Sequence, residues 1–129
     1  MHTEDPFVQA LPENAAFWEA ADRGELLLKH CTDCGKPHWF ARTVCPLCGS
    51  DALEWKTASG RGEIYSFSVV RRVGRPYVLA FVKLDEGPTV MSNIVDTRFE
   101  QLHIGQRVRV VFRAVPEGRL MPFYVPEEA

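Results

Sequence analysis

Four cysteines stand in two pairs whose spacing is typical of a metal site. Cys31-Thr-Asp-Cys34-Gly is followed, ten residues later, by Cys45-Pro-Leu-Cys48-Gly, and these are the four cysteines of the 129-residue chain. Two residues between paired cysteines allow a tight turn that points both sulfurs at one ion, and the following glycine lets the backbone curl towards the thiolates. The pattern therefore predicts one structural zinc ion with four ligands, Cys31, Cys34, Cys45 and Cys48.

The same cysteines leave two other interpretations open. They could form two disulfides, as in proteins of oxidising compartments. Paired turns of this kind also hold iron in rubredoxins, so iron is an alternative metal. A closed site of four thiolates has no open position for water, so it would hold a small fold together rather than catalyse a reaction. The function must therefore depend on other parts of the chain.

Composition and charge narrow the possible partners and location. The formal net charge of −2 at pH 7 gives no general attraction to nucleic acid or to an anionic membrane. No apolar run reaches the length of a membrane span, and the first residues do not resemble a signal peptide. Paired cysteines without a secretion signal fit a reducing compartment, so we expect a cytoplasmic protein without a membrane anchor.

The N-terminal part is expected to contain one short helix. Residues 1–12 hold two prolines and are predicted to be irregular, whereas the alanine-rich segment 13–23 favours a helix that stops at Gly24. Phe17 and Trp18 belong to an apolar stripe on this helix. The stripe could pack on the chain's own domain or dock on a partner protein. The hypothesis is that Phe17 and Trp18 bind the partner.

The segment around the cysteines is expected to form a ribbon. Residues 25–30 and 38–42 are predicted strands that lead into the two cysteine turns, and Trp55 is expected to pack beside them. Residues 59–62, Ser-Gly-Arg-Gly, are expected to be a flexible hinge. The predicted parts are an N-terminal tail and helix in 1–24, a zinc ribbon in 25–58 and a barrel domain in 59–129.

After residue 62 the hydrophobic period becomes two, which indicates strands. Turn residues divide this half into five predicted strands and a helical turn at 96–102 capped by Asp96. The strands are expected at 63–72, 77–84, 89–95, 106–114 and 120–124. Five strands with a short helix between the third and fourth is the plan of an OB-fold. The predicted fold is therefore mainly β, with an N-terminal helix, a zinc ribbon and a five-stranded C-terminal OB-fold barrel.

A set of short stretches runs along nearly the whole chain in a fixed order. They are Phe17-Trp18, Gly24-Glu-Leu26, both Cys-x-x-Cys-Gly turns with Arg42 between them, Trp55, Ser59-Gly-Arg-Gly62, Pro76-Tyr77, Leu84-Asp-Glu-Gly-Pro88, Gly105, Val108-x-Val-x-Phe112 and Pro122-Phe-Tyr-Val-Pro126. With this set the chain resembles the zinc-ribbon/OB-fold family of acyl-CoA-associated proteins, long catalogued as a domain of unknown function. Ala41 stands where the family has proline, and residues 1–12 lie outside the resemblance.

The resemblance implies a rubredoxin-like zinc ribbon and a role without catalysis. Members of the family are accessory subunits that form hetero-oligomers with acyl-CoA enzymes, where they bridge enzymes or complete a coenzyme A channel. Those partners include thiolase-like enzymes, hydroxymethylglutaryl-CoA synthase assemblies, MaoC-like hydratases and steroid side-chain aldolases. The expectation for this chain is a non-enzymatic accessory subunit in lipid or steroid metabolism.

Two groups of charged residues are candidates for chemistry. Arg71, Arg72 and Arg75 crowd the first predicted hairpin turn of the barrel, and guanidinium groups suit the phosphates of coenzyme A. The alternative is a solvated, charged loop. Asp85 and Glu86 could be a catalytic carboxylate pair, but a solvated turn is favoured. No serine or spare cysteine has an evident base in sequence, so no catalytic residue is predicted.

A single-stranded nucleic-acid-binding module is the alternative function, because ribbons and OB-folds both occur in such proteins. Four aromatic residues on the first two predicted strands could stack on bases. They are also candidates for the barrel core, which we favour because alternate strand positions must fill a barrel. Weak net charge and an acidic ribbon half argue against nucleic acid. The aromatic residues are Tyr65, Phe67, Tyr77 and Phe81.

Overall fold

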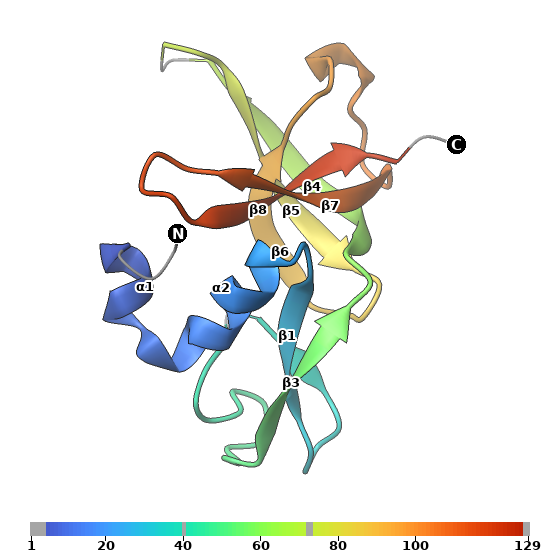
Figure 1. Cartoon of the computed structure of the whole chain (residues 1–129). Coiled ribbons are helices and arrows are strands. Elements are labelled where there is room, and N and C mark those ends of the chain that lie inside the picture. Colours follow the sequence, from blue (N-terminus) through green and yellow to red (C-terminus); the bar gives the residue numbers. More distant parts are fainter. Residues whose placement is uncertain (1–4, 40, 72–73, 128–129) are drawn as a thin grey trace.

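The computed structural model describes residues 5–39, 41–71 and 74–127. It contains a three-stranded sheet, a five-stranded barrel and short helices near the N-terminus that lie beside both (Figure 1). The predicted mainly β fold is confirmed. Within the described ranges, no helix combines the length and apolar character that a bilayer crossing requires.

Three short helical elements come first. They are α1 (Pro6–Ala10), the 3-10 helix η2 (Pro12–Asn14) and α2 (Ala15–Asp22). The expectation that residues 1–12 are irregular is wrong for α1. Pro6 and Pro12 each occupy the first position of a helical element, where a missing N–H costs no hydrogen bond, so the prolines begin helices here instead of breaking them. The chain leaves α2 through Gly24, whose φ is 77°.

The ribbon sheet has the strand order β2-β1-β3, with β1 (Leu26–Cys31), β2 (Pro37–His38) and β3 (Leu53–Ala58). The predicted strand at 38–42 is wrong, because β2 ends at His38. The Arg42 N–H donates to Nε2 of His38 at 3.4 Å, so this backbone group pairs with a side chain instead of a neighbouring strand. Sequence analysis also missed β3, which pairs antiparallel with the whole of β1.

The second half forms an OB-fold barrel, as predicted. Its strands follow the order β4-β5-β6-β8-β7, and the pairing of β4 with β7 closes the barrel. The five strands are β4 (Arg61–Val70), β5 (Tyr77–Leu84), β6 (Thr89–Ile94), β7 (Arg107–Ala114) and β8 (Leu120–Pro126). The 3-10 helix η3 (Phe99–Gln101) lies between β6 and β7, and its cap is Arg98 rather than the predicted Asp96.

The barrel interior is filled by aliphatic residues and one tyrosine. Its most buried side chains are Ile64, Val78, Val82, Leu84, Val108 and Tyr124. The expectation that four aromatic residues fill the barrel holds only for Phe67, which packs against the core opposite Ala80. Tyr65, Tyr77 and Phe81 are exposed on the outer face. The register shift between Ile64 and Ser66 accounts for part of this, because it leaves Tyr65 outside the regular ladder.

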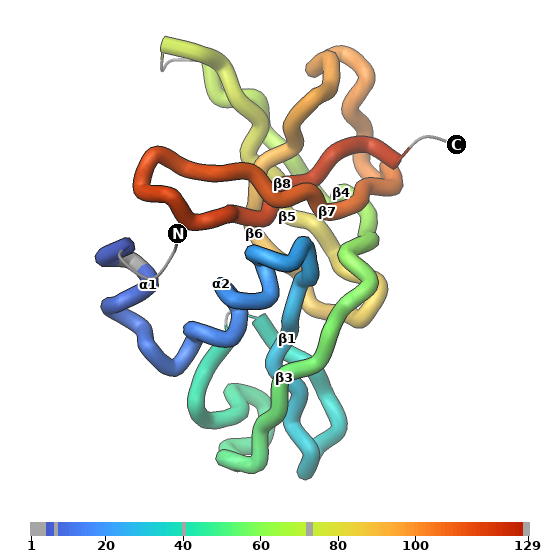
Figure 2. The backbone as a smooth tube through the Cα atoms, in the orientation of Figure 1, coloured from blue at the N-terminus to red at the C-terminus, as the bar shows by residue number. Residues whose placement is uncertain are grey.

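One continuous core joins the helices, the ribbon and the barrel. Phe17 and Trp18 are only 2% and 6% exposed, and both belong to the same buried cluster as the β1 leucines and the barrel residues. The Phe17 ring stacks on Trp39 with centroids 4.7 Å apart. The premise that Phe17 and Trp18 form a docking surface is therefore corrected: both side chains are buried, and α2 lies against β1 and β8 (Figure 2).

Residues 59–62 are an ordered connection, and the expected flexible hinge is wrong. The Ser59 N–H donates to Oε2 of Glu86 at 2.8 Å, and the Val110 N–H donates to the carbonyl of Gly60 at 2.7 Å. Gly62 lies within β4, where a Cβ atom would come within 2.4 Å of the Lys83 carbonyl oxygen. The glycine here permits close approach of two backbones rather than flexibility.

Candidate metal centre

Two similar backbone turns carry the four cysteines. In the first, the Gly35 N–H donates to the Cys31 carbonyl at 2.9 Å, and in the second the Gly49 N–H donates to the Cys45 carbonyl at 2.9 Å. Gly35 and Gly49 have φ of 74° and 82°, a conformation that favours glycine. Each turn is therefore closed by a glycine directly after its second cysteine, as the sequence pattern predicts.

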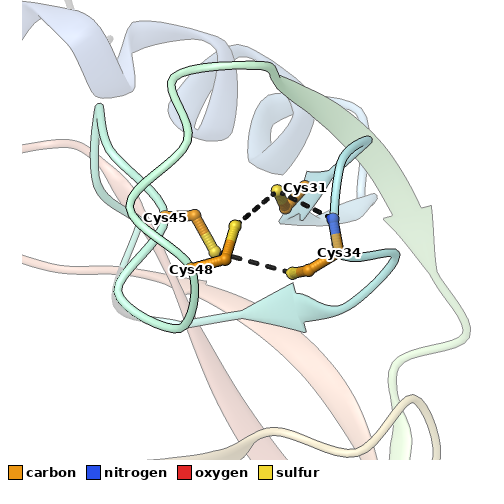
Figure 3. A group of neighbouring side chains, drawn as sticks. All are labelled: Cys31, Cys34, Cys45 and Cys48. Atoms are coloured by element: carbon orange, nitrogen blue, oxygen red, sulfur yellow. Dashed lines mark hydrogen bonds between the residues drawn. The ribbon is translucent and has the colours of Figure 1, made fainter.

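The four sulfur atoms converge on one point (Figure 3). All lie within 4.8 Å of one another; Cys31 and Cys48 Sγ are 3.5 Å apart, and Cys34 and Cys45 Sγ are 3.8 Å apart. Zinc–sulfur bonds of about 2.3 Å place the sulfurs of a tetrahedral site about 3.8 Å apart, so the arrangement fits one zinc ion. No disulfide joins any two of the four cysteines, since these separations are much longer than an S–S bond of about 2.05 Å, which contradicts the disulfide alternative.

Backbone N–H groups point at the sulfurs of both turns. The Cys34 N–H donates to Sγ of Cys31 at 3.5 Å, and the Leu47 N–H donates to Sγ of Cys45 at 3.4 Å. The Cys34 N–H is the main reason that the pKa of Cys31 falls to about 7, and a neighbouring backbone N–H from Asp33 adds to it. Hydrogen bonds of this kind favour the thiolate, which is the form that binds a metal. A bound zinc ion would cross-link the two turns and leave no open coordination position.

Comparison with known proteins bears on both halves of the chain. Residues 18–54 match the family model "ChsH2, rubredoxin-like zinc ribbon domain", and residues 55–113 match "ChsH2, C-terminal OB-fold domain". A DUF35 domain-containing scaffold protein of Methanothermobacter thermautotrophicus is 39% identical over 115 residues, which cover 83% of this chain and 86% of that protein. This chain belongs to the DUF35 family. The family resemblance and the prediction of a site for one zinc ion are thus confirmed.

Several proteins similar to this chain are named as enzymes or as enzyme subunits. A solved structure titled "Ltp2-ChsH2(DUF35) aldolase" superimposes with a TM-score of 0.77 at 31% identity, covering 88% of this chain and 93% of that chain. A probable enoyl-CoA hydratase alpha subunit of Thermomonospora curvata is 30% identical over 125 residues, which are 91% of this chain but 39% of that protein. Another relative is named as a subunit of benzoylsuccinyl-CoA thiolase.

The predicted coenzyme A loop is only partly described. Arg71 follows β4, with its guanidinium carbon 5.6 Å from the Phe99 ring centroid, and Arg75 is exposed in the turn before β5. Arg72 lies outside the described residues. The arginines are thus candidates by position, and their binding to coenzyme A stays a prediction.

The adjacent acids at the β5–β6 turn have separate structural partners. Arg107 donates to both carboxylate oxygens of Asp85 at 2.8 Å, and this charged pair lowers the pKa of the Asp85 carboxyl. Glu86 instead accepts the Ser59 N–H. Asp85 therefore holds the start of β7 to this turn, and Glu86 holds the connection between β3 and β4. A catalytic carboxylate pair is not the arrangement found here.

Sequence analysis missed an exposed apolar surface on the barrel, which we name the outer β4–β6 face; it consists of Tyr65, Phe81 and Met91. Phe81 pairs with Ser66 on one side and with Met91 on the other, so three adjacent strands contribute to it. The side chains of Tyr65, Phe81 and Met91 are 63%, 44% and 63% exposed. The signal in the sequence was the segment 77–82, which is apolar on both faces, whereas a strand with a solvated outer face should alternate.

Proposed function

We propose that this chain is a non-catalytic accessory subunit that binds an acyl-CoA-processing enzyme of the thiolase-like, aldolase or MaoC-like hydratase type. The outer β4–β6 face carries this proposal. Aromatic residues and methionine are enriched in protein interfaces, and contiguous apolar surfaces are uncommon on monomers unless they bind something. Tyr65, Phe81 and Met91 provide such a surface on rigid, hydrogen-bonded strands.

The occupant of this face is argued from the relatives. Relatives of this chain are named as scaffold proteins and as subunits of hydratase and thiolase enzymes, and a solved relative is titled "Ltp2-ChsH2(DUF35) aldolase". These names support a hetero-oligomer with an enzyme of acyl-CoA metabolism. A location in the cytoplasm, where thiolates stay reduced, is part of the proposal. The predicted arginine loop remains available as a contribution to the partner's coenzyme A channel.

The proposal assigns no turnover to the chain itself. Four thiolates would fill the coordination of a zinc ion, so the metal would have no position for water or substrate. The Asp85 and Glu86 carboxylates are bound to Arg107 and Ser59. Steady turnover of an acyl-CoA by the purified chain, abolished by a point substitution in it, would contradict this part.

The partner surface is tested by co-purification from the native source. A variant with Phe81→Ser and Met91→Ser should recover much less enzyme than the wild type while keeping its zinc and its unfolding temperature, because both side chains are outside the core. Ile104→Ser is the matched control, since Ile104 is 69% exposed but lies in the loop before β7. Undiminished recovery of the enzyme with the double variant would reject the outer β4–β6 face as the interface.

Single-stranded nucleic acid is the second candidate, because aromatic residues on exposed OB-fold strands can stack on bases. Tyr65 and Phe81 have that placement. The nearest charged residues along these two strands are Glu63 and Lys83, which are paired across the strands and together provide no net positive charge for a phosphate backbone. Salt-sensitive binding of an oligonucleotide that is lost in Tyr65→Ala would favour this candidate.

A further inference from the structure

The outer side of β7 carries a row of arginines. Val108 and Val110 turn towards the barrel core, so Arg107, Arg109 and Arg113 project outward at alternate positions. On the neighbouring strand, Arg61 is the direct cross-strand partner of Arg109. Like charges in directly opposite positions destabilise a sheet, so this juxtaposition requires compensation by negative charge.

Carboxylates compensate three of these four arginines. Glu127 lies 3.2 Å from Nε of Arg61 and 3.8 Å from Nε of Arg107, which also binds Asp85. Arg113 forms a two-pronged pair with Asp96. Arg109 has no hydrogen-bond or ion-pair partner for its side chain among residues 5–39, 41–71 and 74–127. The arginine opposite Arg61 therefore lacks the negative charge that the other three have.

Arg109 lies in a groove of about 580 Å³ between β4, β7 and β8. Three arginines and two carboxylates line it, which leaves one net positive charge, and the remaining lining is apolar. The lining includes Arg61, Arg109, Arg113, Asp96, Glu127 and Val111. A volume of several hundred Å³ is typical of sites for small organic ligands. The groove thus combines suitable size with an uncompensated guanidinium group.

We propose that this groove binds a phosphorylated small molecule, with a phosphate group placed between Arg61 and Arg109. A phosphate dianion has enough oxygens to accept hydrogen bonds from two guanidinium groups at once, and its charge would relieve the repulsion between them. The two carboxylates in the groove are already paired with Arg61 and Arg113, so Arg109 is the arginine that is available to a ligand. The proposal does not rest on the proposed function, since the isolated chain would bind the phosphate.

The phosphate could belong to the nucleotide end of coenzyme A or to a free oligophosphate. Calorimetric titration of the full-length, zinc-loaded chain at low ionic strength distinguishes these sources with three probes: coenzyme A, dephospho-coenzyme A and inorganic pyrophosphate. Tighter binding of coenzyme A than of pyrophosphate would identify a nucleotide site. Equal binding of coenzyme A and pyrophosphate would identify a site for the phosphate groups alone, and both results support the proposal.

Three variants test the location of the site. Arg109→Gln should weaken binding by at least about tenfold, because it removes a charged hydrogen-bond donor, and should keep the unfolding temperature. Arg23→Gln removes the same charge from the end of α2, outside the groove, and should leave the affinity unchanged. Asp96→Asn should strengthen binding several-fold, because it frees Arg113, and asparagine tolerates the φ of 56° at this position.

Several results would overturn the proposal. One is the lack of binding of all three probes by the wild type. Another is unchanged affinity in Arg109→Gln together with a loss in a fourth variant, Arg75→Gln, which would move the phosphate to the β4–β5 turn. Weaker binding in Asp96→Asn would show that the groove does not act through its positive charge. If an oligonucleotide bound through Arg109 while coenzyme A and pyrophosphate did not bind, the ligand of the groove would be nucleic acid and not a small molecule.

Discussion

The guanidinium group of Arg119 lies 2.6 Å from the carboxylate of Asp5, although 114 residues separate them in sequence. Asp5 is 1% exposed, and Arg119 also lies over the Trp18 ring, with its guanidinium carbon 5.8 Å from the centroid. Arg119 precedes β8, so this contact ties the N-terminal helices to the β7–β8 hairpin. The ion pair and the shared core make the helices, the ribbon and the barrel one structural unit.

The first prediction concerns this buried ion pair. Asp5→Ala should lower the free energy of unfolding by about 3 kcal/mol, because it removes the buried carboxylate that pairs with Arg119 at 2.6 Å and leaves the exposed Glu117, at 3.7 Å, as a weaker partner. Arg23→Gln is the control, since it removes one member of the exposed Arg23–Glu25 pair and should cost less than about 1 kcal/mol. Urea unfolding measures both. Equal small losses in the two variants would show that Asp5 does not hold the N-terminal segment in place.

The second prediction concerns the metal. The purified chain should contain about one zinc ion. Cys45→Ser should lose the ion and lower the stability of the whole chain in a single transition, because the ribbon and the barrel share one core. Elemental analysis and thermal unfolding followed by near-ultraviolet circular dichroism test this. Unfolding of the ribbon alone, with an unchanged barrel transition, would indicate two independent modules. Iron in the protein purified from its native source would contradict the prediction that the metal is zinc.

The third prediction separates core aromatic residues from surface aromatic residues. Phe17→Ala should lower the free energy of unfolding by about 3–5 kcal/mol, because the side chain is enclosed by Trp18, Trp39 and the rest of the core. Phe81→Ala should cost less than about 1 kcal/mol, because that ring is on the outer face. Chemical denaturation compares the two variants. A larger loss for Phe81 would mean that the outer face is covered within the isolated chain.

The fourth prediction concerns pH. Burial, followed by the nearby charges of Lys29 and Arg42, lowers the pKa of His38. A histidine whose pKa is lower in the folded state binds its proton more strongly in the unfolded state, so stability is present above the unfolded pKa of about 6.5 and is lost as pH falls below it.

The variant that isolates this effect is His38→Gln. It should show a smaller fall in unfolding temperature than the wild type between neutral pH and mildly acidic pH, at a zinc concentration that keeps the site saturated. His103→Gln is the control, because His103 is an exposed histidine. The same pH dependence in the wild type and in His38→Gln would assign the acid sensitivity to other groups.

Much of the architecture could be predicted because its causes are local. The cysteine turns depend on residues three positions apart and on the glycines at positions 35 and 49, so their chemistry is visible in a short stretch. The strands of the barrel follow from hydrophobic alternation, which reports one buried and one exposed face. Five such strands and a short helix were sufficient to predict the OB-fold.

Tertiary structure decided the features that depend on pairing between distant segments. The apolar stripe with Phe17 and Trp18 looks the same in sequence whether β8 or a partner covers it, and it is the packing of α2 on β1 and β8 that buries both side chains. Strand β3 was not recognised because its hydrogen bonds come from β1, about 25 residues earlier in some pairs.

The register of strand pairing also determined which side chains lie on the surfaces that could bind other molecules. Tyr65 and Phe81 were expected in the core. The irregular pairing of β4 with β5 leaves Tyr65 outside, and Phe81 faces outward because Ala80 and Val82 on either side of it face the core. Arg61 and Arg109 are 48 residues apart in the chain, and they are cross-strand partners only because β4 and β7 close the barrel at that register. Sequence alone determined which residue types were available; the closure of the barrel determined which charges meet, because side-chain neighbours across strands are set by long-range hydrogen bonding.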